Sequence, residues 1–148
     1  MPDAVDGPFR PVLQDHQPVE PSYNVFSGVF PAIIGGSVGT TLGMLVIARR
    51  LRVSPAVQAA VVGIGVVGVA LGVALALGTT LSNAVSFRAG GLAAFAGQLP
   101  LLLRPFRAWQ ARGDDVASFW GVGVAATIAG LLASAVIGLS VPGIRDTM

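Results

Sequence analysis

The sequence predicts an all-α integral membrane protein with four transmembrane helices, the third of them irregular, and an extended proline-rich tail before the first. The 148-residue chain is 53% hydrophobic and 11% charged, with a mean hydropathy of +0.77. A soluble domain has about a quarter of its residues charged, so this chain cannot cover a soluble surface. Its richness in apolar residues equally excludes a disordered protein. Long uncharged runs then locate the individual spans.

The N-terminal tail, residues 1–24, differs in composition from the membrane domain expected over 25–148. It combines many of the prolines with four acidic residues and a single basic residue, Arg10. This composition has no helical or strand period and cannot bury a core, so we expect an extended tail. Its acidic, polar start also differs from a secretory signal.

The first span is expected at 25–48, an uncharged run that ends in an arginine cluster. At 1.5 Å per residue such a helix measures about 36 Å, more than the roughly 30 Å of bilayer hydrocarbon. Pro31 lies inside this run, where it frees a backbone carbonyl and either adjusts the tilt or acts as a hinge. We expect the tilt adjustment.

Two further spans have clear boundaries. The second is expected at 55–78, because Ser54 suits an N-cap and Pro55 suits the first helical position. The fourth is expected at 116–141, an uncharged run that follows two acidic residues. Acidic residues suit the positive end of a helix, so they favour a helix start there.

The third span, expected at 81–103, is the irregular one. Arg88 interrupts its apolar run and Pro100 lies near its far end. The uncharged stretch 89–103 by itself is short enough for a re-entrant or interfacial segment. Both alternatives, a full span and a re-entrant segment, therefore remain open on the sequence alone.

Loop charges favour the full span. If all four segments cross, six of the nine arginines fall on one side of the membrane, and the positive-inside rule makes that side cytoplasmic. We therefore expect a multi-pass protein of the inner (plasma) membrane with both termini on the non-cytoplasmic side. The exclusive use of arginine as the basic residue suggests a bacterial source. These six arginines are Arg49, Arg50, Arg52, Arg104, Arg107 and Arg112.

Small residues recur at every fourth position in three of the spans. Such stripes allow close approach of helix backbones in lipid, where no hydrophobic force drives association. They predict helix packing within the chain or an interface with a partner, and the pattern does not separate these. The residues concerned are Gly35, Gly39 and Gly43, then Gly68 and Gly72, and finally Ala126, Gly130, Ser134 and Gly138.

Arginines are the candidate contacts for lipid or anions. Arg88 is the one charge inside an expected span, and no acidic residue in any span can neutralise it. It either snorkels to the headgroups or binds an anionic group. The basic loops would attract anionic lipid. The loop arginines considered for this role are Arg49, Arg50, Arg52, Arg104 and Arg107.

The sequence offers no catalytic, metal-binding or cofactor-binding residues. Cysteine is absent, and the single histidine, His16, lies in the tail. Span serines and threonines have no base beside them and usually bond within their helix. No basic stripe interleaves with aromatic residues, so nucleic acid is not an expected partner. We therefore expect a protein that is not an enzyme.

One stretch resembles a known family. Gly35-Gly36-Ser37-Val38-Gly39, with the later Gly78-Thr79-Thr80-Leu81-Ser82-Asn83, resembles motifs of the four-span fluoride channels. The chain departs from that family because Gly43 stands where an arginine is expected and the Thr-Thr-Phe-Ser stretch is missing. In size it resembles the small multidrug transporters, without their first-span glutamate, and its tail and glycine-rich block resemble ABC-2 permeases. These departures leave the family unassigned.

The expected function is that of an accessory or structural subunit of a larger membrane complex. Small-residue faces on several helices, no ion-coupling group inside a span and very short soluble parts favour this hypothesis. Expected partners are the lipid bilayer and other membrane subunits or further copies of the chain. The alternatives are a self-associating, holin-like pore or channel and the membrane part of a transporter.

Overall fold

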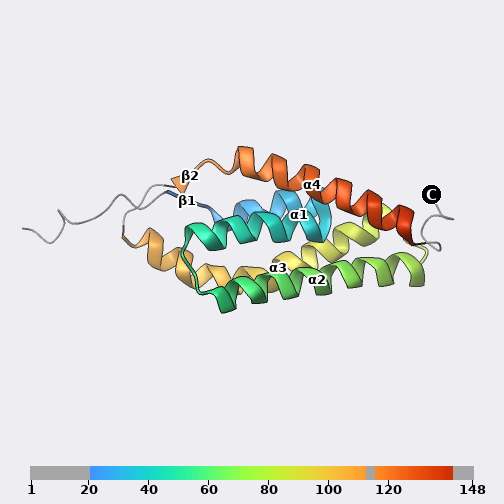
Figure 1. Cartoon of the computed structure of the whole chain (residues 1–148), viewed down its shortest axis with the longest axis horizontal. Coiled ribbons are helices and arrows are strands. Elements are labelled where there is room, and N and C mark those ends of the chain that lie inside the picture. Colours follow the sequence, from blue (N-terminus) through green and yellow to red (C-terminus); the bar gives the residue numbers. More distant parts are fainter. Residues whose placement is uncertain (1–20, 113–115, 142–148) are drawn as a thin grey trace, which may run out of the picture.

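The computed structural model describes residues 21–112 and 116–141, so most of the predicted tail lies outside the described residues. The described part is a bundle of four helices with one short parallel sheet at one end (Figure 1). In chain order the elements are strand β1 (Ser22–Tyr23), the 3-10 helix η2 (Val25–Gly28), α1 (Val29–Arg50), α2 (Pro55–Gly78), α3 (Asn83–Gln110), strand β2 (Val116–Ala117) and α4 (Trp120–Ser140).

Three segments are long and apolar enough to cross a membrane: Val25–Arg50, Pro55–Gly78 and Trp120–Ser140. The third helix, α3, is not among them, because charged and polar side chains lower its hydropathy. It is nevertheless a continuous helix of 28 residues that contains two prolines, Pro100 and Pro105. The expected all-helical fold is therefore confirmed, with three segments that are long and apolar enough to span by length and composition.

Of the two spans with clear predicted boundaries, one is confirmed and the other starts later than expected. The predicted span 55–78 coincides with α2, where Ser54 caps the helix by accepting a hydrogen bond from the Val57 N–H and proline occupies the first turn. The predicted span 116–141 starts too early, because α4 begins at Trp120. Residues Val116–Ala117 instead pair with Ser22–Tyr23 as parallel strands. This pairing ties the start of the described chain to the α3–α4 connection.

The segment 25–50 is not a straight helix but a hairpin. Its helical path breaks at Gly36, with φ 64° and ψ −158°. In a straight helix residues 28 and 44 would lie about 24 Å apart. Here a methyl group placed on Gly28 would lie 2.8 Å from the sulfur of Met44, and the Arg50 guanidinium lies 5.3 Å from the Tyr23 ring centroid. The chain therefore turns back on itself, as Figure 1 shows.

The hairpin has two antiparallel arms, which we call the first arm (25–35) and the second arm (37–50). Each arm measures roughly 20 Å, less than the hydrocarbon thickness of a bilayer. Residues 25–48 therefore do not form the single continuous helix of about 36 Å that their uncharged run predicts. Gly36 makes the reversal: its backbone angles lie in a region that only glycine adopts at low cost.

Close helix packing holds the hairpin between the other helices. The first arm packs on α3, where a methyl group at Gly91 would lie 2.8 Å from the Gly36 backbone. The second arm packs on α4, where a methyl group at Gly39 would lie 2.8 Å from the Ala126 carbonyl oxygen. Such distances leave no room for side chains, so these glycines set the separation of the helices.

The opposite ends of the bundle differ. At the end that carries β1 and β2, called the sheet end, large side chains from the second arm, α2 and α3 form the main core. At the other end, called the pocket end, α2 connects to α3 and α4 finishes at Ser140. Prominent members of the core are Met44, Ile47, Val61, Leu102, Phe106, Trp109 and Phe119.

The described chain starts and finishes at opposite ends of the bundle. Ser22 lies in the sheet, whereas Val141 follows α4 at the pocket end (Figure 1). The hairpin returns the chain to the end where it started, while the two termini themselves, for which we expected a shared side, lie outside the described residues. Both arginine clusters lie at the sheet end, one at the close of the second arm and one at the close of α3.

The outward faces of α2 and α4 are apolar. Val67 is 67% exposed and Leu132 is 64% exposed, and their neighbours one turn away are similarly exposed. A continuous apolar surface of this kind is costly in water and favourable against lipid tails. The outer surface therefore agrees with the spanning character of these two helices.

Candidate functional site: a pocket below the hairpin tip

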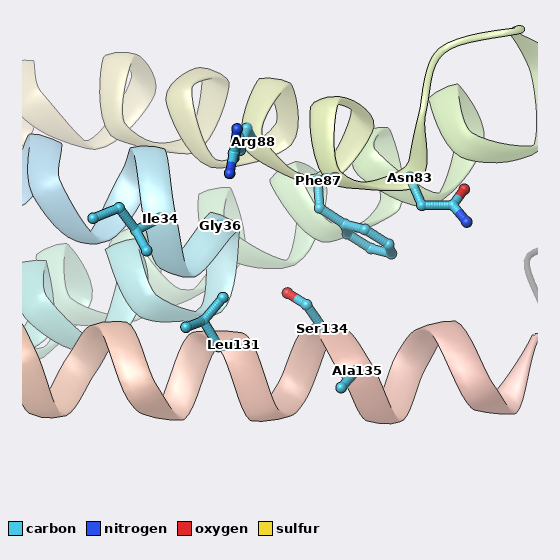
Figure 2. A pocket seen from close by; sticks show the side chains of 9 residues that line it. Ile34, Gly36, Asn83, Phe87, Arg88, Leu131, Ser134 and Ala135 are labelled. Atoms are coloured by element: carbon cyan, nitrogen blue, oxygen red, sulfur yellow. The ribbon is translucent and has the colours of Figure 1, made fainter. Parts of the chain in front are cut away.

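A pocket of about 230 Å³ lies at the pocket end, next to the hairpin tip (Figure 2). Its lining comes from three elements that are distant in sequence: the hairpin tip, the first two turns of α3 and the second half of α4. The lining residues are Ile34, Gly36, Asn83, Ala84, Phe87, Arg88, Leu131, Ser134 and Ala135.

The pocket follows from the length of the hairpin. Helices α3 and α4 each pack extensively on the hairpin but make few contacts with each other. The hairpin ends about halfway along α2, since Ser37 beside its tip lies against Gly68 in the middle of that helix. Beyond Gly36 no described element separates α3 from α4, so a space remains between them.

The hairpin tip contributes backbone groups to the pocket wall. The reversal at Gly36 interrupts the regular helical hydrogen bonding, and the Gly36 carbonyl oxygen accepts a hydrogen bond from the Thr40 hydroxyl at 2.8 Å. Its α-carbon faces α3 and α4: a methyl group there would lie 3.3 Å from the Phe87 carbonyl oxygen and 3.5 Å from the Ser134 hydroxyl oxygen. No side chain fits at the tip without narrowing the pocket.

Polar side chains reach the pocket from the two flanking helices. Figure 2 shows the Ser134 hydroxyl directed from α4 toward the hairpin tip, with the Phe87 ring extending from α3 on the opposite wall. Asn83 lies in the first turn of α3, directly after Ser82, which caps that helix by accepting a hydrogen bond from the Val85 N–H. Apart from Arg88, the other side chains of the lining are apolar.

Arg88 makes the pocket electropositive. It is exposed and forms no hydrogen bond or ion pair with another residue of the described part. Residues 21–112 and 116–141 contain no aspartate or glutamate. The start of α3 adds the positive end of its helix dipole, whereas the two hairpin arms present opposite dipole ends at Gly36 and largely cancel.

The small-residue stripes contact other helices of the same chain. In the hairpin, a methyl group at Gly35 would meet the Thr127 backbone at 3.0 Å, and one at Gly43 would meet the Phe119 ring at 3.2 Å. In α2, the corresponding positions lie against α3, with Gly68 beside Ala94 and Gly72 beside Phe87.

The α4 stripe faces the hairpin in the same manner. A methyl group at Gly130 would lie 2.7 Å from the Gly39 nitrogen, and Ala126 supplies the backbone that Gly39 meets. Ser134 lines the pocket and Gly138 is buried near the end of the helix.

A second polar feature lies among the second arm, α2 and α3. The side chain of Gln98 is fully buried, and its amide nitrogen donates to the Thr41 hydroxyl at 3.1 Å and to the Val61 carbonyl oxygen at 2.9 Å. Sequence reasoning overlooked this glutamine. A signal was present, because an amide inside an apolar run needs hydrogen-bond partners from neighbouring helices.

The structure separates the candidate arginines into two groups. Arg88 lines the pocket, while Arg49, Arg50 and Arg52 lie at the sheet end together with those at the close of α3, Arg104 and Arg107. Among residues 21–112 and 116–141, no group of three or more histidine, cysteine, aspartate or glutamate side chains could hold a metal ion.

The pocket also includes residues that sequence reasoning did not single out as a site. Gly36, Asn83 and Phe87 belong to this set. The adjacent glycines Gly35 and Gly36 were a usable signal for the turn. No local signal in the sequence predicts that α3 and α4 line the same pocket.

The fold and the pocket define an all-helical protein with helices apolar enough to cross a membrane and a hairpin that ends halfway along the bundle. Comparisons with protein-family models, curated proteins and solved structures found no match to this chain.

Proposed function

We propose that this chain is a non-enzymatic, multi-pass membrane protein that supplies the membrane part of a solute pathway. The observation that carries this proposal is the broken helix at Gly36, which faces a pocket halfway along the bundle. At membrane depth, irregular backbone is tolerated only where protein buries it or where it lines a polar cavity. Discontinuous helices of this kind form solute and ion sites in transporters.

The hairpin geometry favours the transport alternative over an accessory subunit. The accessory role rested on small-residue faces available to a partner, but Gly39 packs on Ala126 and Gly68 packs on Ala94 within the chain. A partner would have to bind elsewhere, for example on the exposed faces of α2 or α4.

The pocket does not continue through the bundle. The hairpin arms and the core at the sheet end fill the other half of the molecule. A complete pathway therefore requires either movement of the hairpin or association with another subunit or a second copy. Partners in the membrane thus remain part of the proposal.

A revised topology accompanies this function. We infer that α2, α3 and α4 cross the membrane and that the hairpin enters and leaves from the sheet end. The positive-inside rule makes the sheet end cytoplasmic, because both arginine clusters lie there. The pocket then opens toward the outside of a plasma membrane, the chain enters from the cytoplasm, and α4 finishes outside.

The crossing by α3 is compatible with its charges. Arg88 lies one to two turns from the start of the helix, and the next arginine, Arg104, lies near its other end. The apolar interval between them spans about 22 Å at 1.5 Å per residue. Long arginine side chains can extend toward the headgroups on both sides, so the interval suffices for a crossing.

Water access to the pocket tests the proposed function. The chain has no native cysteine, so single cysteines can be introduced without background. In proteoliposomes, we expect Ser134→Cys to react with a membrane-impermeant thiol reagent, whereas the lipid-facing control Leu132→Cys stays unreactive. Equal, negligible reaction at both positions would contradict the proposal.

Conductance in planar bilayers extends this test to transport. We expect purified protein carrying Ser134→Cys to give currents that fall when the pocket cysteine is modified. Currents insensitive to that modification would contradict a pathway through the pocket. Electrical silence of the protein together with a copurifying partner would favour the accessory-subunit hypothesis instead.

A further inference from the structure

We propose that the pocket below the hairpin tip binds a phosphate-type oxyanion, supplied either by a free anion or by a phospholipid headgroup. This inference rests on the proposed function in that it concerns the same pocket and names the chemical class of its ligand. Its evidence is independent of water access, because it comes from charge and shape.

An uncompensated arginine is the first observation. Arg88 lines the pocket within a helix that we place in the membrane, and it has no ion-pair partner in the described part of the chain. An arginine at membrane depth is costly unless a counter-charge accompanies it. Since residues 21–112 and 116–141 contain no acidic side chain, the described protein cannot supply that counter-charge, and an anionic ligand can.

The donors around the pocket fit an oxyanion. A guanidinium group presents several N–H donors in a planar fork that matches phosphate oxygens. The Ser134 hydroxyl points toward the same space (Figure 2). The start of α3, at Asn83 and Ala84, lies at the pocket rim and favours negative charge there.

The size and lining of the pocket fit an anion with an organic part. Its volume of about 230 Å³ equals that of several waters, at about 30 Å³ each in the liquid. Ile34, Phe87 and Leu131 supply an apolar wall beside the polar groups. A cation would meet Arg88 without a carboxylate from residues 21–112 or 116–141 to offset the repulsion, so the described lining selects against cations.

The potential in the pocket can be measured with charged reagents. In detergent free of phosphate groups, the reaction rates of Ser134→Cys with an anionic and a cationic methanethiosulfonate are compared. We expect Arg88→Gln to lower the ratio of anionic to cationic rate about tenfold, the size expected for one nearby unit charge. The control Arg112→Gln removes an arginine beyond the other end of α3 and should leave the ratio unchanged. A ratio unaffected by Arg88→Gln would overturn the proposal.

Competition distinguishes the two sources of the oxyanion. Inorganic phosphate and phosphatidylglycerol are added separately to Ser134→Cys protein with and without Arg88→Gln. Protection by inorganic phosphate that depends on Arg88 indicates a free anion, and protection by phosphatidylglycerol alone indicates a lipid headgroup. Protection by neither overturns the proposal.

Asp146 provides a further control, since it is the acidic residue that follows α4 in the sequence. We expect Asp146→Asn to leave the rate ratio unchanged. A large rise in the ratio would show that this carboxylate already neutralises Arg88, and would overturn the proposal.

Native mass spectrometry keeps the two proposals distinguishable. If the pocket cysteine reacts with neither reagent, the proposal of a water-accessible pathway is contradicted. Mass spectrometry can still detect a bound anion by the mass that it adds. We expect the protein to retain phosphatidylglycerol or inorganic phosphate, and Arg88→Gln to lose most of it while Arg112→Gln keeps it. Equal retention by the two variants would overturn oxyanion binding at Arg88.

Discussion

At the scale of single residues, Gly36 has the largest structural consequence. Its φ of 64° with ψ of −158° allows the chain to reverse within an apolar segment that otherwise reads as one helix. Because a side chain in this backbone region is strained, glycine is required there regardless of the space around it. The residue also forms part of the pocket wall, so one position links the fold to the site.

Replacing Gly36 with alanine tests this requirement. We expect Gly36→Ala to lower the free energy of unfolding by about 1–3 kcal/mol, the cost of a strained backbone conformation. The control is Gly63→Ala, since Gly63 in α2 has no atom within 4 Å of the added methyl group. Denaturant titration in detergent measures both variants, and equal stabilities would contradict the reversal at Gly36.

Gln98 also acts at this scale, as a polar link between the second arm and its neighbours. Its amide bonds to Thr41 in the second arm and to Val61 in α2. Interhelical hydrogen bonds in membranes contribute about 0.6 kcal/mol on average. The link therefore favours one position of the hairpin without dominating its stability.

A double-mutant cycle measures this link. We expect Gln98→Leu and Thr41→Val to show a coupling energy of about 0.6 kcal/mol, and at most about 1.7 kcal/mol, when unfolding is followed in detergent micelles. Strict additivity of the two substitutions would mean that the hydrogen bond between Gln98 and Thr41 does not form.

At the scale of elements, glycine stripes bring the helices close together. The hairpin meets α4 and its N-cap residue Phe119 through Gly35, Gly39 and Gly43, and α2 meets α3 through Gly68 and Gly72. Backbone atoms rather than flexible side chains lie opposite several of these glycines. Such contacts cannot yield by rotamer changes, so larger residues must separate the elements.

Substitution at Gly39 should separate the hairpin from α4. A side chain there would meet the Ala126 carbonyl oxygen at 2.8 Å, so we expect Gly39→Leu to give aggregated or unstable protein. Gly121→Leu, at a position of α4 with no atom within 4 Å, should run as a monodisperse species in size-exclusion chromatography. Identical elution profiles for the two variants would contradict the packing between the second arm and α4.

Much of the element structure could be predicted, and the hairpin could not. The start of α2 follows from Ser54 and Pro55, which are local capping signals. Hydropathy and length cannot distinguish a straight apolar helix from two shorter ones, so residues 25–48 read as one span. The pocket could not be predicted from the sequence, because it forms where α3 and α4 are not in contact. Sequence periodicity shows which face of a helix is apolar but not which helices stay apart.

At the scale of the whole molecule, the hairpin changes the number of crossings that we propose. A straight first helix gives four crossings and places both termini on one side. In the topology we propose, the hairpin returns to its starting end and three crossings remain. The described ends of the chain lie at opposite ends of the bundle. Both arrangements keep the two arginine clusters together, so the positive-inside rule alone cannot choose between them.

Cysteine accessibility in sealed, oriented vesicles tests the hairpin most directly. Single cysteines replace Pro21 before the hairpin, Ala111 after α3 and Ser82 between α2 and α3. We predict that Pro21→Cys and Ala111→Cys react with an impermeant thiol reagent from the same side, the cytoplasmic one, and that Ser82→Cys reacts from the opposite side. Reaction of Pro21→Cys from the same side as Ser82→Cys would mean that the segment 25–48 crosses the membrane, and would contradict the hairpin.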